Sequence, residues 1–201
     1  MTTLLLAVGM TLVTLAALPY IRAVQQGRVR PRLVSWMVWA VLMTILTVTS
    51  IQAREVASAV LAAVGAVQCT LIVLIGWRIG SRYLGRLDVS SLVGAAIGLG
   101  VLLATNDLLM ATIITVSVDA IAYLPTLKHA WDSPEEESLA SFALSASGAW
   151  LCLASALLSG AAVEGIIYPV YSAVVGTVMV AILLYGRAVP YAEEAYEYGS
   201  D

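Results

Sequence analysis

Seven apolar runs of about 20 residues each, separated by short polar segments, dominate this chain. A helix rises ~1.5 Å per residue, so about 20 apolar residues cross the ~30 Å hydrocarbon core of a bilayer. Membrane strands are not expected, because the runs are too long and lack an alternation of apolar and polar residues. The runs therefore predict seven transmembrane helices. They cover residues 3–21, 33–53, 56–77, 89–106, 108–127, 138–163 and 165–186.

The composition agrees with a chain whose solvent is lipid. Of the 201 residues, 61% are hydrophobic and only 11% are charged, whereas soluble domains are typically ~25% charged. The net charge is −3, and the sequence has no basic stripe of the kind that binds nucleic acid. We therefore expect an all-α integral membrane protein surrounded by membrane lipid, with no nucleic-acid partner. A homo-oligomer is left open.

The basic residues predict the orientation. With seven spans, the loops after the first, third and fifth helices lie on the same side as the C-terminus. Nine basic residues fall on that side, and Arg54 alone falls on the other. The positive-inside rule then places the N-terminus outside and the C-terminus in the cytoplasm of a plasma membrane. The nine residues are Arg22, Arg28, Arg30, Arg32, Arg78, Arg82, Arg86, Lys128 and Arg187.

Local signals predict where helices begin. The segment Ser133-Pro134-Glu135-Glu136 has the pattern of a capping box with proline at the first helical position, so it is expected to open the sixth helix. Asp88 and Asn106 are expected N-caps of the fourth and fifth helices. Residues 189–201 are expected to form a frayed, acidic cytoplasmic tail.

An internal repeat relates the two halves of the chain. A shift of 106 positions places Leu18-Pro19 on Leu124-Pro125, and a shift of 109 places Glu55 on Glu164. Repeats of this length are a mark of transporter folds. The sequence therefore predicts a first triple-helix repeat, a linker helix that keeps the two repeats parallel, a second triple-helix repeat and a tail. Their ranges are 1–80, 81–106, 107–188 and 189–201.

This 3+1+3 plan resembles that of the SWEET and PQ-loop-repeat transporters, as does a proline near the cytoplasmic end of the first helix of each repeat. The family's Pro-Gln pair reads Pro19-Tyr20 and Pro125-Thr126 here. The pair Trp36 and Trp39 is also similar to the aromatic motif of SWEET-like nicotinamide-riboside permeases, although Leu42 stands where that motif has tyrosine. The resemblance implies transport of a small polar solute by alternating access, without a cofactor.

Candidate binding residues come from polar stripes and from the resemblance. Polar side chains are expected to turn away from lipid, and the second, fifth and sixth helices carry them every three or four residues. For the serines of the sixth helix, tight packing is the alternative. Gln68 and Thr177, which the shift of 109 relates, stand at the positions where sugar-transporting SWEETs carry an asparagine on the third helix of each repeat. The predicted substrate-binding residues are Trp36, Trp39, Gln68, Thr115, Asp119, Tyr123, Ser145, Tyr171 and Thr177.

Asp119 is the candidate proton-coupling residue. It lies near the middle of the fifth run, where an aspartate costs ~2.5–3.5 kcal/mol on insertion scales. No lysine or arginine lies in mid-membrane to pair with it. Packing alone does not need a carboxyl group, so a role in binding and releasing a proton is one interpretation. The other is a structural hydrogen bond to a neighbouring helix.

Three prolines inside predicted helices are candidate hinges: Pro19, Pro125 and Pro169. Proline frees a backbone carbonyl and bends a helix. The first two recur in the repeat, which favours a gating role, and the alternative is that they only end their helices. For Pro169 the alternative is packing near the outer interface.

Other function classes have less support in the sequence. A retinal photoreceptor needs a lysine on its last helix, and the only lysine is Lys128. No Ser/His/Asp set, metal cluster or carboxylate pair indicates an enzyme, and His129 and the two cysteines do not make a metal site. A transporter of a sugar, vitamin or amino acid is the first hypothesis. A non-transporting PQ-loop-like receptor or assembly subunit is the alternative.

Overall fold

The computed structural model describes residues 1–29, 31, 33–80, 85–105 and 107–198. These residues form seven α-helices and one short 3-10 helix, η1, and they contain no strand. The predicted all-helical class is therefore confirmed. The helices are α1 (Thr2–Gln25), α2 (Leu33–Gln52), α3 (Val56–Gly76), α4 (Arg86–Thr105), α5 (Leu108–Asp132), η1 (Pro134–Glu136), α6 (Leu139–Leu158) and α7 (Val163–Tyr198).

Six of these helices are long and apolar enough to cross a membrane: α1, α2, α3, α5, α6 and α7. They support a multi-pass membrane protein. The fourth predicted span corresponds to α4, which is not among the six, so a count of seven spans stays a prediction.

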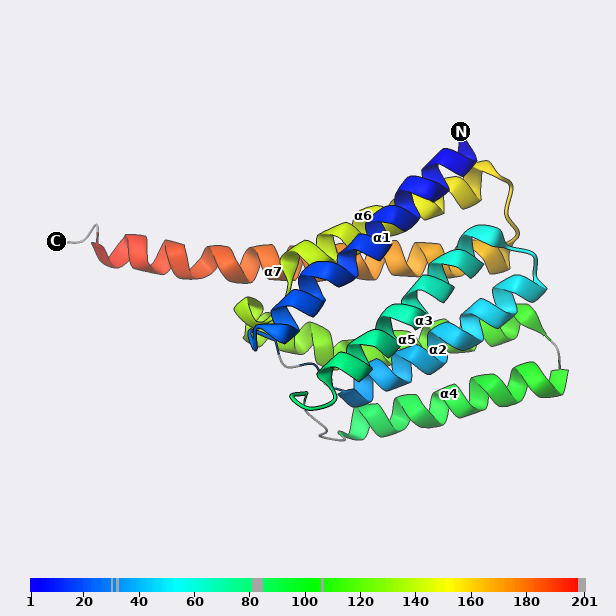
Figure 1. The fold of residues 1–201 in the computed structure, drawn as a ribbon, viewed down its shortest axis with the longest axis horizontal. Coiled ribbons are helices and arrows are strands. Elements are labelled where there is room, and N and C mark those ends of the chain that lie inside the picture. Colours follow the sequence, from blue (N-terminus) through cyan, green and yellow to red (C-terminus); the bar gives the residue numbers. More distant parts are fainter. Residues whose placement is uncertain (30, 32, 81–84, 106, 199–201) are drawn as a thin grey trace.

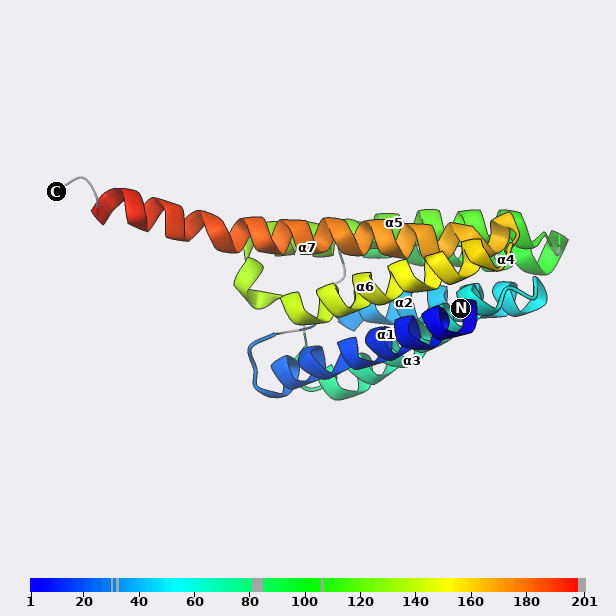
Figure 2. The ribbon, with the colours of Figure 1, turned by 90° about the horizontal axis from the view of Figure 1, so that it is seen from above.

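The helices form a bundle in which two sets of three face each other. Within one set α3 lies between α1 and α2, and within the other α7 lies between α5 and α6. Across the bundle α1 packs along α6, and α2 packs along α5. The helix α4 packs on α5 and α2, at the edge of the bundle (Figure 1). The N-terminus and the C-terminal ends of α2, α4 and α6 lie at one end of the bundle, and Figures 1 and 2 show the last turns of α7 reaching beyond the other.

Glycines allow the closest approach between the two sets. Gly9 of α1 faces Gly148 of α6, and a Cβ added at Gly9 would lie 2.8 Å from the Gly148 carbonyl oxygen. A Cβ added at Gly148 would lie 2.5 Å from the Gly9 carbonyl oxygen. Small residues at such a crossing let two backbones touch, which is how helices associate in lipid. The helix α4 also makes a close contact through a glycine, because Gly94 of α4 lies against Val118 of α5.

The start of α6 differs from the expectation. Pro134 begins only the short helix η1, and α6 begins at Leu139 with Ser138 as its N-cap. The Ser138 side chain accepts from the amide of Ser141, 3.4 Å away, whereas Ser133 makes no side-chain cap. The capping-box prediction was wrong because the chain leaves the helical conformation again at Glu137, whose backbone is extended.

The helix starts also differ from two other predicted N-caps, Asn106 and Asp88. The N-cap of α5 is Asp107, whose side chain accepts from the amide of Met110, 2.9 Å away. The expected cap Asn106 lies outside the described residues. Asp88 lies inside α4, which begins two residues earlier at Arg86.

The prolines do not end their helices. Both α1 and α5 continue for more than a turn beyond Pro19 and Pro125, so the interpretation of these residues as helix stops was wrong. Pro169 is buried inside α7. A hinge role stays a prediction for all three. The helix α7 also runs on to Tyr198, so residues 189–198 continue a helix and do not form the expected frayed tail.

Candidate functional site

A cavity of about 170 Å³ lies between the two sets of helices. Its wall includes Trp36, Trp39 and Met43 from α2, and Asp119 and Tyr123 from α5. The remaining lining residues come from α1, α3, α6 and α7. They are Val13, Leu61, Gly65, Gln68, Cys69, Phe142, Ser145, Tyr168, Tyr171, Ser172, Val175 and Gly176.

Most of the predicted binding residues meet at this cavity. The structure brings together Trp36, Trp39, Gln68, Asp119, Tyr123, Ser145 and Tyr171, which lie on five different helices. The stripes of α2, α5 and α6 therefore converge on one space.

Two predicted binding residues lie elsewhere. Thr115 is buried, but it does not line the cavity, and its hydroxyl donates to the Ala111 carbonyl one turn back, 2.7 Å away. Thr177 donates to the Ala173 carbonyl and accepts from Trp150 Nε1, 3.0 Å away. Its neighbour Gly176 lines the cavity instead. Consecutive residues on a helix point about 100° apart, so the repeat alignment selected the right turn of α7 but the wrong face.

Asp119 is the one acid among the described residues of the cavity wall. Its side chain is only 5% exposed. The phenol of Tyr171 is close enough to interact with the carboxyl group, yet neither Asp119 Oδ1 nor the Tyr171 hydroxyl has a partner at hydrogen-bond distance within the described part of the chain. No lysine, arginine or histidine is among the described residues that line the cavity. The carboxyl group is therefore buried without a balancing charge in this wall.

A row of aromatic rings leads up to this carboxyl group. Tyr20 of α1 contacts Trp36, with ring centroids 5.0 Å apart. Trp36 meets Trp39 edge-on at 5.1 Å, and Trp39 lies against Tyr123 at 5.4 Å. The indole Nε1 of Trp39 is buried and has no hydrogen-bond partner among the described residues. The cavity wall thus combines aromatic rings with one carboxyl group, and two of its donors, Trp39 Nε1 and the Tyr171 hydroxyl, have no partner among the described residues.

Gln68 contributes less to the cavity than predicted. Its amide Nε2 donates to the backbone carbonyl of Val13 and so joins α3 to α1. A shift of 106 relates Val13 to Asp119, so the first repeat has an apolar residue where the second has its acid. The two repeats therefore contribute unequal chemistry to the cavity.

Several lining residues were not predicted. Tyr168 donates a hydrogen bond to Sδ of Met43, 2.9 Å away, and this contact joins α7 to α2. Met43 lies one turn after Trp39 on α2, so the helical period carried a signal for it. Cys69 lines the cavity as well. Sequence periodicity gave no reason to separate Tyr168 from other aromatic residues of the last helix.

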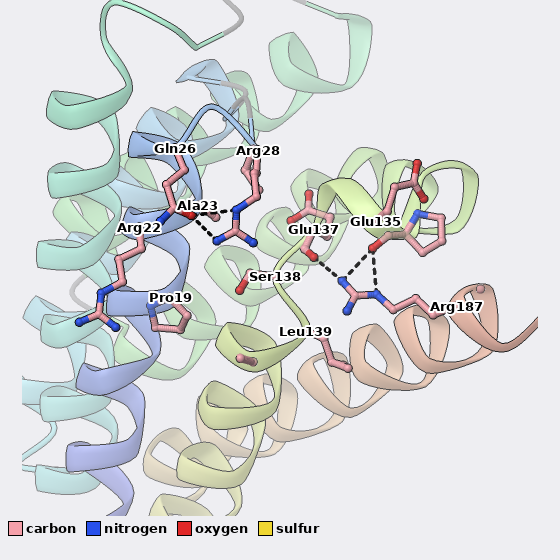
Figure 3. Close-up of a pocket in the computed structure, with 14 residues that line it drawn as sticks. Pro19, Arg22, Ala23, Gln26, Arg28, Glu135, Glu137, Ser138, Leu139 and Arg187 are labelled. Atoms are coloured by element: carbon pink, nitrogen blue, oxygen red, sulfur yellow. Dashed lines mark hydrogen bonds between the residues drawn. The ribbon is translucent and has the colours of Figure 1, made fainter.

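Two further cavities lie toward the end of the bundle that carries most basic residues, and each shares lining residues with the next. The middle cavity, about 200 Å³, shares Trp36, Trp39 and Phe142 with the central cavity. The outer one, about 970 Å³, shares Glu137 with the middle cavity. We call this outer cavity the vestibule. It lies between the end of α1 and the segment from η1 to the start of α6 (Figure 3).

Charged side chains surround the vestibule. Arg22, Arg28 and Arg187 line it together with Glu135 and Glu137. Arg187 holds the η1 segment in place, because its Nη2 donates to the carbonyl oxygens of Pro134 and Glu137, 3.1 and 2.6 Å away (Figure 3).

Glu137 is the buried acid of this end. It is 8% exposed, and its Oε2 has no hydrogen-bond partner among the described residues. It lies between η1 and α6, outside the helices that are long enough to span a membrane. Burial, and to a lesser extent the nearby Glu136 carboxylate, raises the pKa of Glu137 to about 7. The carboxyl group at the junction of two cavities therefore titrates near neutral pH.

The opposite end of the bundle is held by contacts between the two sets of helices. Glu55, in the loop after α2, accepts a hydrogen bond from the amide of Ala162, 2.9 Å away in the loop before α7. Ser155 of α6 donates to the carbonyl of Thr2 at the start of α1, 3.0 Å away. These contacts tie the halves together where the vestibule does not reach.

Comparison with protein-family models, curated proteins and solved structures gives no match for this chain. Within the part of the chain that the structure describes, no three His, Cys, Asp or Glu side chains gather into a possible metal site. The candidate site is therefore described from the positions and chemistry of its own residues.

Proposed function

We propose that this chain is a membrane transporter that moves a small polar solute by alternating access. The observation that supports this proposal is a row of three cavities from the vestibule to the buried carboxyl group of Asp119, each of which shares lining residues with the next. Cavities on one side of the central site, together with contacts of Glu55 and Ser155 that join the two sets of helices at the other end, fit a transporter in one of its two states. The solute would bind in the central cavity.

The packing of the helices supports a 3+1+3 plan. Exchanging α1, α2 and α3 for α5, α6 and α7 turns the α1–α6 contact into the α2–α5 contact, and both contacts are present. The same exchange turns an order of α1, α3, α2 into α5, α7, α6, which is the observed order. Two parallel triple-helix repeats with α4 as a seventh, linking span are part of the proposal, as in the SWEET and PQ-loop transporters that the sequence resembles.

The orientation follows from the charges. The vestibule end carries Arg22, Arg28 and Arg187, and Arg54 lies at the other end. By the positive-inside rule the vestibule faces the cytoplasm of a plasma membrane, and the N-terminus lies outside. The state described is then open to the inside, with Glu55 at the closed outer gate.

Asp119 is the proposed proton-coupling residue. It is the one acid among the described residues of the central cavity wall, and its Oδ1 has no partner there. Pro19, Pro125 and Pro169 are the proposed hinges, since each lies inside a helix that would have to move relative to the other set. No cofactor and no enzymatic reaction are part of the proposal.

Reconstitution tests the proposal. A thermal-shift screen of the purified protein against sugars, vitamins, amino acids and amines would first identify a ligand, because a ligand at 100 times its Kd stabilises the folded state by ~2.7 kcal/mol. Proteoliposomes should then take up that ligand, and a pH gradient should change the rate of uptake. Binding without any flux, together with a protein that co-purifies, would favour the alternative of a receptor or assembly subunit.

A further inference from the structure

The geometry of the central cavity points to a small organic cation as the solute, bound between aromatic rings and Asp119 in competition with a proton. This inference rests on the proposed transport function and adds the chemical class of the ligand. A primary amine or a quaternary ammonium compound has the required chemistry.

The charge of the cavity is the first argument. Asp119 is buried, its Oδ1 has no partner among the described residues, and the described lining residues include no basic side chain. A buried carboxylate needs a positive partner or a proton. With a neutral solute the carboxyl group meets this requirement only by keeping its proton, and an anionic solute adds a second negative charge. An ammonium group beside the carboxylate removes the net charge of the site.

The aromatic rings are the second argument. Trp39 and Tyr123 line the cavity beside Asp119, and Tyr168 and Tyr171 line it from α7. The face of an aromatic ring attracts a cation through its quadrupole, most strongly for tryptophan and where water is excluded. Aromatic rings grouped around one carboxyl group are suited to an ammonium ion whose substituents are apolar.

The volume limits the size of the ligand. The cavity holds about 170 Å³, whereas sites for drug-sized molecules measure ~300–1,000 Å³. Two donors on residues of the cavity wall, Trp39 Nε1 and the Tyr171 hydroxyl, have no hydrogen-bond partner among the described residues and are available to an oxygen on the ligand. A cation of choline size with one hydroxyl group meets both conditions.

Competition with a proton follows from the single acid. The cation binds the carboxylate, so a protonated Asp119 must release its proton to the water of the vestibule when the cation binds. The site then carries either one proton or one cation, and exchange of the two across the membrane follows.

No other carboxyl group is among the described residues that line the cavity, so Asp119 is the acid that exchanges its proton for the cation. Among the described lining residues, α2 presents no titratable side chain to it, α3 presents Cys69, and α7 presents Tyr168 and Tyr171. Tyr123 lies one turn away on α5 itself. The remaining charged residues of α5 and of the elements that pack on it lie near helix ends, apart from Arg187 at the vestibule. Those near helix ends are Arg86, Asp88, Asp107, Lys128, His129, Asp132, Glu135, Glu136, Glu164, Glu193, Glu194 and Glu197.

The test compares ligands that differ only in charge. The probes are choline, tetramethylammonium and dimethylbutanol, in which a carbon replaces the ammonium nitrogen of choline. Calorimetric titration of the purified full-length chain should show that choline binds at least tenfold more tightly than dimethylbutanol. At acidic pH the affinity for choline should fall up to tenfold per pH unit, and the binding enthalpy should depend on the buffer because one proton is released per cation.

Choline binding by substituted proteins shows which residues cause these effects. Asp119→Asn should lose choline binding together with its pH dependence, whereas Asp107→Asn, the same change at the N-cap of the same helix, should alter neither. Trp39→Leu should weaken choline binding by roughly 2- to 30-fold, and Trp39→Phe should retain more of it because a ring face remains. If Asp119→Asn does not fold, the ligand pair and the Trp39 variants still decide the question.

The outcomes separate this inference from the transport function. Equal binding of choline and dimethylbutanol, binding of neither cation, or a pH dependence that persists in Asp119→Asn overturns the cation site. Choline binding that requires Asp119, without choline flux in proteoliposomes, supports the cation site and overturns transport. Uptake of a neutral solute by a protein that binds neither cation supports transport and overturns the cation site.

Discussion

The Glu55 carboxylate accepts a hydrogen bond from the backbone amide of Ala162, 2.9 Å away and 107 residues later in the chain. The contact places an anion at the start of α7, where amides lack intrahelical partners and the helix dipole favours negative charge. Gly165 leaves room for it, because a Cβ at that position would overlap the Glu55 side chain. Glu55 and Gly165 therefore help to join the two halves of the protein at this end.

Removing this contact should open the outer end. In a Cys152→Ala background, Glu55→Ala and Gly165→Ala should each speed the labelling of Cys69, which lies in the central cavity, by a membrane-impermeant maleimide added from outside. Mass spectrometry of the intact protein measures the rate. Glu164→Ala, an acid in the first turn of α7 itself, is the control and should change little. Unchanged labelling in both variants would show that Glu55 does not gate this end.

Asp119→Asn should abolish the effect of a pH gradient on uptake, because asparagine keeps the shape of the side chain but does not titrate. The measurement is uptake of the ligand found by thermal shift into proteoliposomes, with and without a gradient. Exchange at equal pH should persist for a neutral solute and be lost for a cation. Unchanged pH dependence would mean that Asp119 has only a structural role.

The glycine crossing of α1 and α6 predicts a stability effect. Gly148→Ala places a Cβ 2.5 Å from the Gly9 carbonyl oxygen, so the helices must separate. Overpacking of this kind costs ~1–3 kcal/mol. Thermal unfolding in detergent should show a lower midpoint for Gly148→Ala. At Gly100 of α4 a Cβ meets nothing within 4 Å, so Gly100→Ala should be neutral or stabilising by up to ~1 kcal/mol. Equal midpoints for the two variants would contradict the close crossing.

Glu137 predicts a pH dependence of stability. Its pKa is about 7 in the folded protein, against 4.5 for a glutamate side chain exposed to water. The folded state therefore holds a proton that the unfolded state releases, so stability should fall as the pH rises from 4.5 to about 7. The total is about 3 kcal/mol. Glu137→Gln should remove this dependence in unfolding measurements, and Glu135→Gln, on the exposed side of the same segment, should preserve it. A Glu137→Gln protein with the slope of the wild type would refute the assignment.

The orientation can be tested by fusion. A reporter joined after Asp201 that works only in the cytoplasm should be active, because the vestibule end is predicted to face inward. A periplasmic reporter at the same site should be inactive. The opposite result would reject both the orientation and the count of seven spans.

The sequence by itself determined where helices lie along the chain and their apolar character. Apolar length is a local property, so the boundaries of α2 and α3 follow from the runs 33–53 and 56–77. The helical period also predicted which faces of α2, α5 and α6 turn inward, and it brought Trp39, Asp119 and Ser145 to one cavity.

Only the tertiary structure decided which inward-facing residues share a space. Thr115 and Asp119 lie one turn apart on the same buried face, yet only Asp119 reaches the cavity. The hydrogen bond from Ala162 to Glu55 joins loops that have no pattern in common. Such relationships depend on how far each helix is rotated and shifted against its neighbours. Rotation and shift are set by contacts between distant residues, such as Gly9 with Gly148, and a local pattern does not contain them.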